Sequence, residues 1–166
     1  AAEVIGRIEH RDDVELGAKL TQLPLRVRKP AADQLAWAEA LLSTEEAKAV
    51  KPSRPVIYAR ETQGLATYPE TLPIALQALR IGDLTIASAP CEVFAVTGLT
   101  IKKESAAKAT FTIELANGYG GYLPPQEQHE YGGYETWPAR SSFLEVEAES
   151  RIRTTLLDLI RAVNGK

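Results

Sequence analysis

Two short segments of this sequence carry side chains that could do chemistry, and each follows an apolar run that is expected to form a strand. The first is APCEVF, residues 89–94, in which Glu92 comes directly after the run LTIASA. Ligands and catalytic groups in α/β sheets favour the carboxyl ends of strands. A carboxylate in this position can bind a metal ion or act as a base. The alternative is that Glu92 only complements the dipole of a following helix from its first turn.

The second segment is NGYGGYLPPQEQHEYGGYETW, residues 117–137, which holds four tyrosines and five glycines. The glycines at 118, 120 and 121 permit unusual backbone angles and close approach to a ligand. Pro124 and Pro125 stiffen the chain just after Tyr122. A linker would rarely carry so many aromatic residues, which favours tyrosines placed for a purpose. Composition alone leaves open that they pack on the rim of the core with their hydroxyls in water.

Few other residues offer metal ligands or nucleophiles. The chain has two histidines, His10 and His129, and one cysteine, Cys91. No internal disulfide is therefore possible, and the usual Cys/His zinc frameworks are excluded within this chain. Each histidine is interpreted as a surface or hydrogen-bonding residue, with a functional role as the alternative.

Length and composition predict one globular domain. The chain has 166 residues, of which 45% are hydrophobic and 25% charged, values that suit a single domain with a core. Its net charge of −3 gives no reason to expect a nucleic-acid partner. No apolar run reaches the length of a transmembrane helix. The chain opens with Ala-Ala-Glu and contains no methionine, so we expect it to be a piece of a longer protein.

The clearest strands are those that lead into the two chemical segments. Residues 71–90 contain two β-rich runs that flank Ile81-Gly82-Asp83, which predicts an antiparallel pair joined by a short turn. The second run is nearly all apolar or small and is expected to be a central, buried strand. Residues 109–117 predict another buried strand, which ends in the glycine- and tyrosine-rich loop. Residues 18–28 alternate in polarity and contain Pro24, which predicts an edge or bulged strand.

Helices are expected on either side of these strands. The apolar spacing favours helices over residues 2–11, after Pro30, in part of 56–70, and from Glu92 to 105. In the last helix, Ser142 and Glu145 are expected to form a capping box. The residues predicted for its core face are Ile152, Leu156, Leu159, Ile160 and Val163. The fold class is therefore α/β (α+β), a mixed sheet flanked by helices in a single domain.

The two chemical segments together resemble a known enzyme family. RIGDLTIASAPCEVFAVTGLTIK (residues 80–102) and ELANGYGGYLPPQEQHEYGGYE (residues 114–135) look like the late part of the catalytic domain of neutral/alkaline, non-lysosomal ceramidases. More specifically, they resemble shorter ceramidase-like proteins of environmental bacteria. In that family a strand reading R-I-G leads to P-x-E, and a later strand leads to Y-x-G-Y. The resemblance covers residues 71–166 well and the first 70 residues with less distinctive motifs.

This resemblance implies a role for each chemical residue. The family's enzymes are zinc amidohydrolases that cleave ceramide into a fatty acid and sphingosine, with zinc held by two histidines, a glutamate and a tyrosine. The glutamate of P-x-E matches Glu92 and the second tyrosine of Y-x-G-Y matches Tyr122, which makes both candidate zinc ligands. Tyr134, twelve residues after Tyr122 and directly before Glu135, matches the tyrosine that stabilises the oxyanion. Tyr119 and Tyr131 keep the packing interpretation.

The departures from the family pattern limit what this chain can do alone. The two histidine ligands belong to upstream motifs that the chain lacks, and neither His10 nor His129 matches them. Cys91 replaces the small residue usual before the glutamate and is considered as an unexpected ligand. The spacing from Glu92 to Tyr122 is shorter than in the longer ceramidases, and their C-terminal immunoglobulin-like domain is absent. The chain is thus expected to hold at most half of a zinc site and to bind no stoichiometric zinc.

Three interpretations stay open from the sequence. In the first, the chain is the C-terminal portion, residues 1–166, of a ceramidase-like catalytic domain and is inactive by itself. In the second, it is a non-catalytic α/β binding or structural module. In the third, the full protein hydrolyses another amide or ester. Under the resemblance, the partner is a lipid amide such as ceramide, and a secreted or periplasmic location is favoured. The substrate cannot be read from the fold, because function depends on the site.

Overall fold

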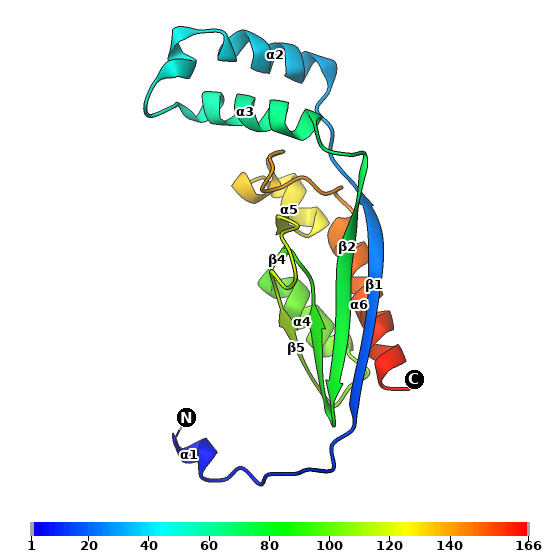
Figure 1. The fold of residues 1–166 in the computed structure, drawn as a ribbon. Coiled ribbons are helices and arrows are strands. Elements are labelled where there is room, and N and C mark those ends of the chain that lie inside the picture. Colours follow the sequence, from blue (N-terminus) through cyan, green and yellow to red (C-terminus); the bar gives the residue numbers. More distant parts are fainter. Residues whose placement is uncertain (1, 166) are drawn as a thin grey trace.

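The computed structural model describes residues 2–165, in which a four-stranded mixed sheet has helices on one of its faces and a small two-stranded sheet lies at its end (Figure 1). The strands are β1 (Leu16–Arg26), β2 (Thr71–Ile81), β3 (Leu84–Ser88), β4 (Glu92–Val93), β5 (Ala109–Ile113) and β6 (Tyr122–Leu123). The helices are α1 (Ala2–Ile5), α2 (Ala32–Leu42), η1 (Glu45–Lys48), α3 (Arg54–Ala66), α4 (Ala95–Glu104), α5 (Gln126–Tyr131), η2 (Tyr134–Thr136) and α6 (Ala148–Val163). The predicted fold class is confirmed.

The main sheet has the strand order β1-β2-β3-β5. β1 and β2 pair antiparallel over their full lengths, and β3 follows β2 through a turn in which Gly82 has a φ of 58°. That turn is the one predicted around Ile81-Gly82-Asp83. β5 runs parallel to β3, with α4 as the crossover between them. Because β3 and β5 are parallel, the chain leaves both strands at the same end of the sheet.

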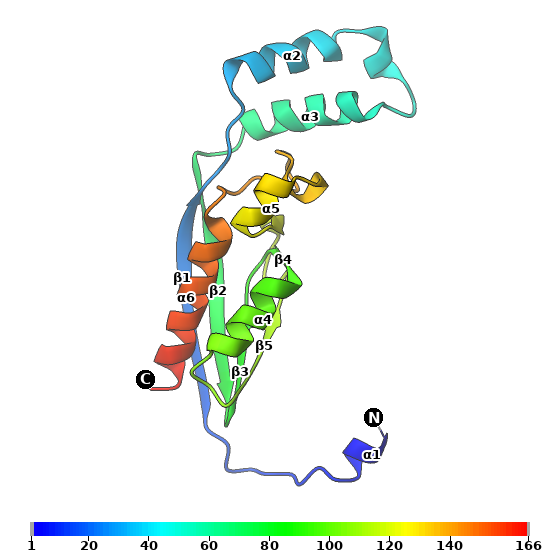
Figure 2. The same ribbon diagram turned by 180° about the vertical axis from the view of Figure 1, so that it is seen from behind.

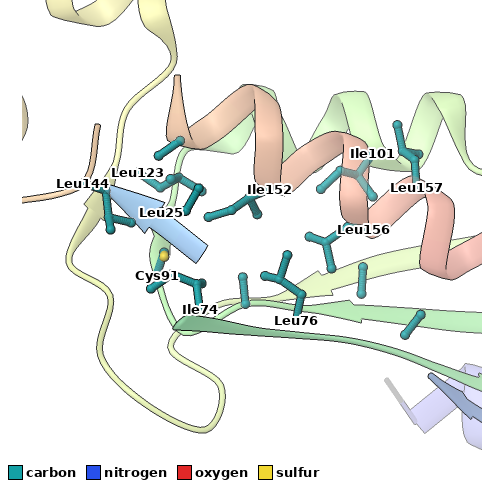
Figure 3. Packing of buried hydrophobic residues seen from close by; sticks show 14 of the residues in the cluster. Leu25, Ile74, Leu76, Cys91, Ile101, Leu123, Leu144, Ile152, Leu156 and Leu157 are labelled. Atoms are coloured by element: carbon teal, nitrogen blue, oxygen red, sulfur yellow. The ribbon is translucent and has the colours of Figure 1, made fainter. Parts of the chain in front are cut away.

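The core lies between this sheet and α6. In Figures 1 and 2, α4 and α6 lie on the same side of the sheet. Figure 3 shows side chains from β1, β2 and α6 meeting in the core. Its largest buried members include Leu25, Leu76, Ile101, Leu123, Ile152, Leu156 and Ile160. The apolar positions predicted for the last helix are confirmed, since they recur every three or four residues and so share one helix face.

The start of that helix was predicted wrongly. α6 begins at Ala148, six residues beyond Ser142, and its N-cap residue Glu147 makes no side-chain capping bond. Ser142 instead donates to the Glu135 carbonyl and accepts from Arg28 at 2.8 Å. The pattern S-x-x-E resembles a capping box, but here each residue serves a tertiary contact.

Glu145 is buried and joins β1 to α6 through two arginines. Its carboxylate accepts hydrogen bonds from the Arg26 side chain at 2.8 Å and from Arg151, and its Oε1 also accepts from the Arg26 amide at 3.1 Å. Burial raises the pKa of Glu145, but the bonds from Arg26 and the charges of Arg151 and Arg26 outweigh it, so the net shift is downward from 4.5. The folded state is therefore stabilised by the ionised form.

Replacing Glu145 with alanine is expected to lower the free energy of unfolding at pH 7 by about 1–2 kcal/mol, because a buried acceptor is lost but both arginines keep access to water. Since its folded pKa is depressed, the contribution is full above 4.5 and disappears as pH falls through the lower folded value. Urea denaturation at pH 7 and at about pH 3 measures the difference, with the exposed Glu45→Ala as control. An equal difference at the two pH values would contradict this assignment.

Two other helices differ from expectation. The N-terminal helix ends at Ile5 rather than near residue 11. Val4, Ile5 and Ile8 are all exposed, so their helical spacing has no packing partner among the described residues. α3 is longer than the predicted short helix and begins at Arg54, with Pro55 in its first turn, where a missing amide hydrogen costs nothing.

α2 and α3 form a helical hairpin beyond one end of the sheet (Figure 1). The hairpin is tied to the segment after η2. The Arg140 side chain donates two hydrogen bonds to Glu61, at 2.7 and 3.0 Å, and the Arg140 amide donates a third at 2.9 Å. The rings of Tyr58 and Trp137 meet edge to face at 5.3 Å. This anchoring fixes the backbone next to Ser141, which matters for the site below.

Candidate functional site

The two chemical segments meet in a second, two-stranded sheet at the end of the main one. β4 and β6 pair in parallel, with Glu92 opposite Tyr122. The Glu92 amide donates to the Gly121 carbonyl at 2.9 Å, and the Tyr122 amide donates to the Ser141 carbonyl at 2.8 Å. Both segments lie at the same edge of the main sheet, because β3 and β5 are parallel. Glu92 was wrongly expected to begin a helix: α4 starts three residues later, at Ala95.

Four side chains gather at this pairing, and we call them the Glu–Tyr cluster: Glu92, Tyr119, Tyr122 and Tyr134. The Tyr119 hydroxyl donates to Glu92 Oε1 at 3.4 Å. The rings of Tyr122 and Tyr134 lie edge to face, with centroids 5.6 Å apart and planes at 80°. The structure thus brings together the three residues that the sequence singled out, and adds Tyr119.

The electrostatics of the cluster favour a neutral phenol at Tyr122. Desolvation first, then the charge of Glu92 and a side-chain hydrogen bond with Tyr134, raise the pKa of Tyr122 to about 12. Desolvation and Glu92 also raise the pKa of Tyr119 above its usual value of 10. A nearby dication would oppose these effects, because positive charge favours the phenolate.

We expect the Tyr122 phenol of the metal-free chain to titrate near pH 12. Glu92→Gln is expected to lower that pKa toward the ordinary value, because it removes the negative charge that disfavours the phenolate. Carbon-13 NMR of selectively labelled tyrosine measures the Tyr122 pKa in the parent chain and in the variant. A Tyr122 pKa near 10 in the parent chain, or no downward change in the variant, would contradict the proximity of the two groups.

Cys91 packs in the core in this arrangement, whereas the sequence left a ligand role open. It is fully buried in the core next to β4 (Figure 3). Burial raises the pKa of its thiol to about 12, and metals bind the thiolate. Its sulfur fills the space beside Gly120, where an added Cβ would lie 2.6 Å from Sγ. Cys91 is therefore a packing residue that fixes the loop before Tyr122.

Two adjoining cavities open beside Tyr119. One, of about 320 Å³, is lined by Tyr68, Pro69, Leu72, Tyr119 and Phe143. The other, of about 370 Å³, is lined by Glu61, Tyr68, Tyr119, Arg140 and Ser141. The first is mainly apolar and the second carries the Glu61–Arg140 ion pair, so an amphipathic molecule could lie against the cluster from this side.

Two side chains of the cluster carry oxygen donors of the kind that metal ions bind. Glu92 and Tyr122 offer two oxygen donors from opposed positions in the β4–β6 pair. Within residues 2–165, no group of three histidine, cysteine, aspartate or glutamate side chains could hold a metal ion. His10 is exposed beyond α1, and His129 lies on α5, where burial and the Arg28 charge lower its pKa.

The sequence interpretation missed Tyr119 and misjudged Tyr131. Both were assigned to packing, yet Tyr131 is 81% exposed and Tyr119 is bonded to Glu92. The available signal for Tyr119 was its position three residues before Tyr122 in the same loop. That signal becomes informative only once the β4–β6 register is known, because the register places Glu92 beside this loop.

Comparison with solved structures places this arrangement in a known fold. The structure matches one described as "Ceramidase complexed with C2" with a TM-score of 0.62, and neutral ceramidase from Pseudomonas aeruginosa with a TM-score of 0.63. The chain has the fold of part of a neutral ceramidase. Both matches are 18% identical in sequence and cover 99% of this chain, but only 32% and 31% of the matched chains.

The match therefore spans about a third of each ceramidase structure. At 18% identity it establishes the shared fold, and the roles of individual residues rest on the geometry above. No protein-family model matches the sequence, and the search of curated proteins found no match. None of the described helices is both long enough and apolar enough to cross a bilayer.

Proposed function

We propose that this chain is the C-terminal portion of the catalytic unit of a zinc-dependent amidohydrolase, and that it is inactive by itself. The assembled protein, meaning this chain with the polypeptide that completes the ceramidase-like fold, would hydrolyse the N-acyl amide of ceramide or a related lipid. The observation that carries the proposal is the β4–β6 register, which sets Glu92 opposite Tyr122, with the Tyr134 ring against that of Tyr122.

Each member of the cluster then has a distinct task. Glu92 and Tyr122 supply two of the metal's oxygen ligands. Bound zinc polarises a carbonyl and lowers the pKa of its water toward neutrality, which makes an inert amide open to attack. Tyr134 is 56% exposed, so its hydroxyl is accessible to a substrate and can donate a hydrogen bond to the oxyanion of the tetrahedral intermediate. Tyr119 holds the Glu92 carboxylate in place as a positioning residue.

The cavities beside Tyr119 support a lipid amide as the substrate class. An apolar wall formed by Tyr68, Leu72 and Phe143 lies next to a polar one with Glu61 and Arg140. A molecule with an acyl chain and a hydroxylated head could contact both at once. The alternative substrate, another amide or ester with an apolar part, would use the same surfaces.

The first test measures zinc in the isolated chain and in the assembled protein. We expect no stoichiometric zinc in the chain, because two donors bind weakly, and one zinc per assembled protein. The second test measures fatty-acid release from ceramide by the assembled protein, with Glu92→Ala as the inactive control. A tightly held zinc in the isolated chain would contradict the half-site, and an upstream coding sequence without paired histidine motifs would contradict the enzyme proposal.

A non-catalytic module with the same scaffold is the competing proposal. It agrees with the lack of a three-residue acidic, histidine or cysteine group within the described part of the chain. The hydrolase and the non-catalytic module predict different results for the assembled protein. A module would bind no zinc and release no fatty acid from ceramide or other acyl amides, whereas release from another amide alone would keep the hydrolase proposal and change its substrate.

A further inference from the structure

The main sheet has one face that α4 and α6 cover and one that they leave bare, and we call the second the open face (Figures 1 and 2). The register assigns its residues, because side chains alternate between the two faces. They are Leu16, Ala18, Leu20, Gln22, Pro24 and Arg26 of β1, Thr71, Pro73, Ala75, Gln77, Leu79 and Ile81 of β2, Leu84, Ile86 and Ser88 of β3, and Ala109, Phe111 and Ile113 of β5. Buried residues such as Leu76 and Ala78 point to the opposite face, against α6.

The open face carries one charged residue, Arg26 at the end of β1, and its side chain is paired with Glu145 at 2.8 Å. This contrasts with the solvated faces of antiparallel sheets, which alternate apolar inward and polar outward positions. Its polar members at the site end are also paired: Ser88 Oγ lies 3.4 Å from Gln77 Oε1, which in turn accepts from Asn117 Nδ2 at 2.9 Å. This composition is typical of a surface that is buried against another protein layer.

The apolar side chains on this face are accessible. Leu16 is 76% exposed and Leu20 58%, and Phe111 and Ile113 are each 43% exposed. At about 3.3 Å per residue and about 4.8 Å between strands, the four strands present roughly 500 Å². That is as large as the largest apolar patch of a typical monomer, and such patches commonly mark interaction sites.

The open face is continuous with an unpaired sheet edge and with the Glu–Tyr cluster. β5 is the last strand of the sheet and pairs only with β3 among the described strands. Beside it, an apolar groove of about 410 Å³ runs between α4 and β5, lined in part by Phe94, Leu99 and Phe111. Asn117, which bonds Gln77 on the open face, begins the loop that leads to Tyr119 and Tyr122. A layer on this face would therefore border the cluster.

The identity of that layer follows from how much of the matched fold is present. The chain is covered almost completely, yet about two thirds of each matched ceramidase chain has no counterpart here. We propose that the open face and the β5 edge form the docking surface for the polypeptide that completes the ceramidase-like fold. The inference rests on the proposed function for the identity of this partner. It adds where the partner binds, and that it meets the open face with an uncharged, apolar layer.

The experiment uses the 166-residue chain and, as the probe, the polypeptide encoded immediately upstream of Ala1 in the same genome. Leu79→Lys and Leu20→Lys place a charge on the open face in two different strands. Val50→Lys makes the same kind of change at a side chain that is 99% exposed and lies between η1 and α3, outside the sheet. We expect each open-face variant to weaken the complex at least about tenfold, and Val50→Lys to leave its Kd unchanged.

Thermal melting of each isolated variant shows whether it is folded, and we expect melting temperatures within about 2 °C of the parent because the replaced side chains are accessible. Equal affinity of folded open-face variants and parent would overturn the inference. The inference would also be overturned if the probe did not bind the parent chain, or if no such upstream polypeptide were encoded. A homodimer or binding to phosphatidylcholine vesicles that Leu79→Lys abolishes would also overturn it, since a second copy or a lipid surface would then be the occupant.

The proposed function fails separately. Glu92→Ala is expected to leave the complex with the probe intact, because Glu92 lies outside the open face. A complex that forms through the open face but holds no zinc and releases no fatty acid would support the docking surface and refute the hydrolase. The opposite outcome is an assembled protein that is active and whose activity and complex both survive Leu79→Lys and Leu20→Lys. It would support the hydrolase and refute the docking surface.

Discussion

Replacing Tyr134 with phenylalanine is expected to lower kcat/KM of the assembled protein for an N-acyl amide by about 10²–10³-fold, mainly through kcat, because one preorganised oxyanion donor contributes that much. The expectation rests on the proposed function. The ring is kept, so its edge-to-face contact with Tyr122 at 5.6 Å should persist. Its hydroxyl is the group removed, and the side chain is more than half exposed, so the free energy of unfolding should change little.

The matched control is Tyr131→Phe, which removes a hydroxyl from the same loop at a side chain that is 81% exposed. It should leave both kcat and KM unchanged. Zinc content and melting temperature of Tyr134→Phe separate two roles for Tyr134, that of oxyanion donor and that of support for Tyr122. Normal zinc and normal melting with a reduced kcat agree with an oxyanion donor. Loss of zinc with kcat restored at excess metal would instead assign Tyr134 to supporting Tyr122.

Periodicity in the sequence predicted the strands of the main sheet well, but the prediction that residues 109–117 form a buried strand was wrong, because β5 is an edge strand with exposed side chains. β2, β3 and β5 each alternate or run apolar between turn residues, and the turn at Gly82 demands a positive φ of 58° that glycine accepts at little cost. α6 was recognised by the spacing of Ile152, Leu156 and Ile160, all fully or almost fully buried. These signals are local, so a single sequence contains them.

What the sequence could not predict depends on distant contacts. Ser142 and Glu145 match a capping box letter by letter, yet Arg28 and Arg26, more than a hundred residues earlier, hold them in other roles. β4 and β6 have only two residues each, too few to show a period. Their pairing, which builds the Glu–Tyr cluster, is fixed by the parallel arrangement of β3 and β5 and by the Ser141 carbonyl.

Under the proposed function, the incomplete donor set and the open face would be two consequences of the same partial fold. A largely apolar sheet face is costly to leave in water, and two oxygen donors without further ligands hold zinc weakly. A single partner would remove both deficits, because the open face leads through Asn117 to the cluster. The chain would then gain stability from its partner, since a ligand that binds only the folded state stabilises it.

Replacing Gly121 with alanine is expected to be the most disruptive single change in the site, lowering the free energy of unfolding by about 3 kcal/mol or more. Gly121 has a φ of 71°. An added Cβ would lie 2.6 Å from the Ser141 carbonyl oxygen and 2.9 Å from its carbon. That carbonyl accepts the Tyr122 amide, and the Arg140–Glu61 bonds hold the neighbouring residue, so the backbone has little freedom to move away.

Gly132→Ala separates the steric effect from the backbone strain. Gly132 also has a positive φ, 81°, with ψ at −163°, but an added Cβ there would meet no atom within 4 Å, so only the backbone strain of about 1–3 kcal/mol is expected. Urea denaturation measures both variants, and hydrogen exchange of the Glu92 amide reports whether its 2.9 Å bond to the Gly121 carbonyl survives. Equal destabilisation by the two changes, with the Glu92 amide still protected in Gly121→Ala, would show that β4 and β6 can separate from residue 141 without losing their register. The placement of Glu92 opposite Tyr122 would then depend on the β3–β5 frame alone.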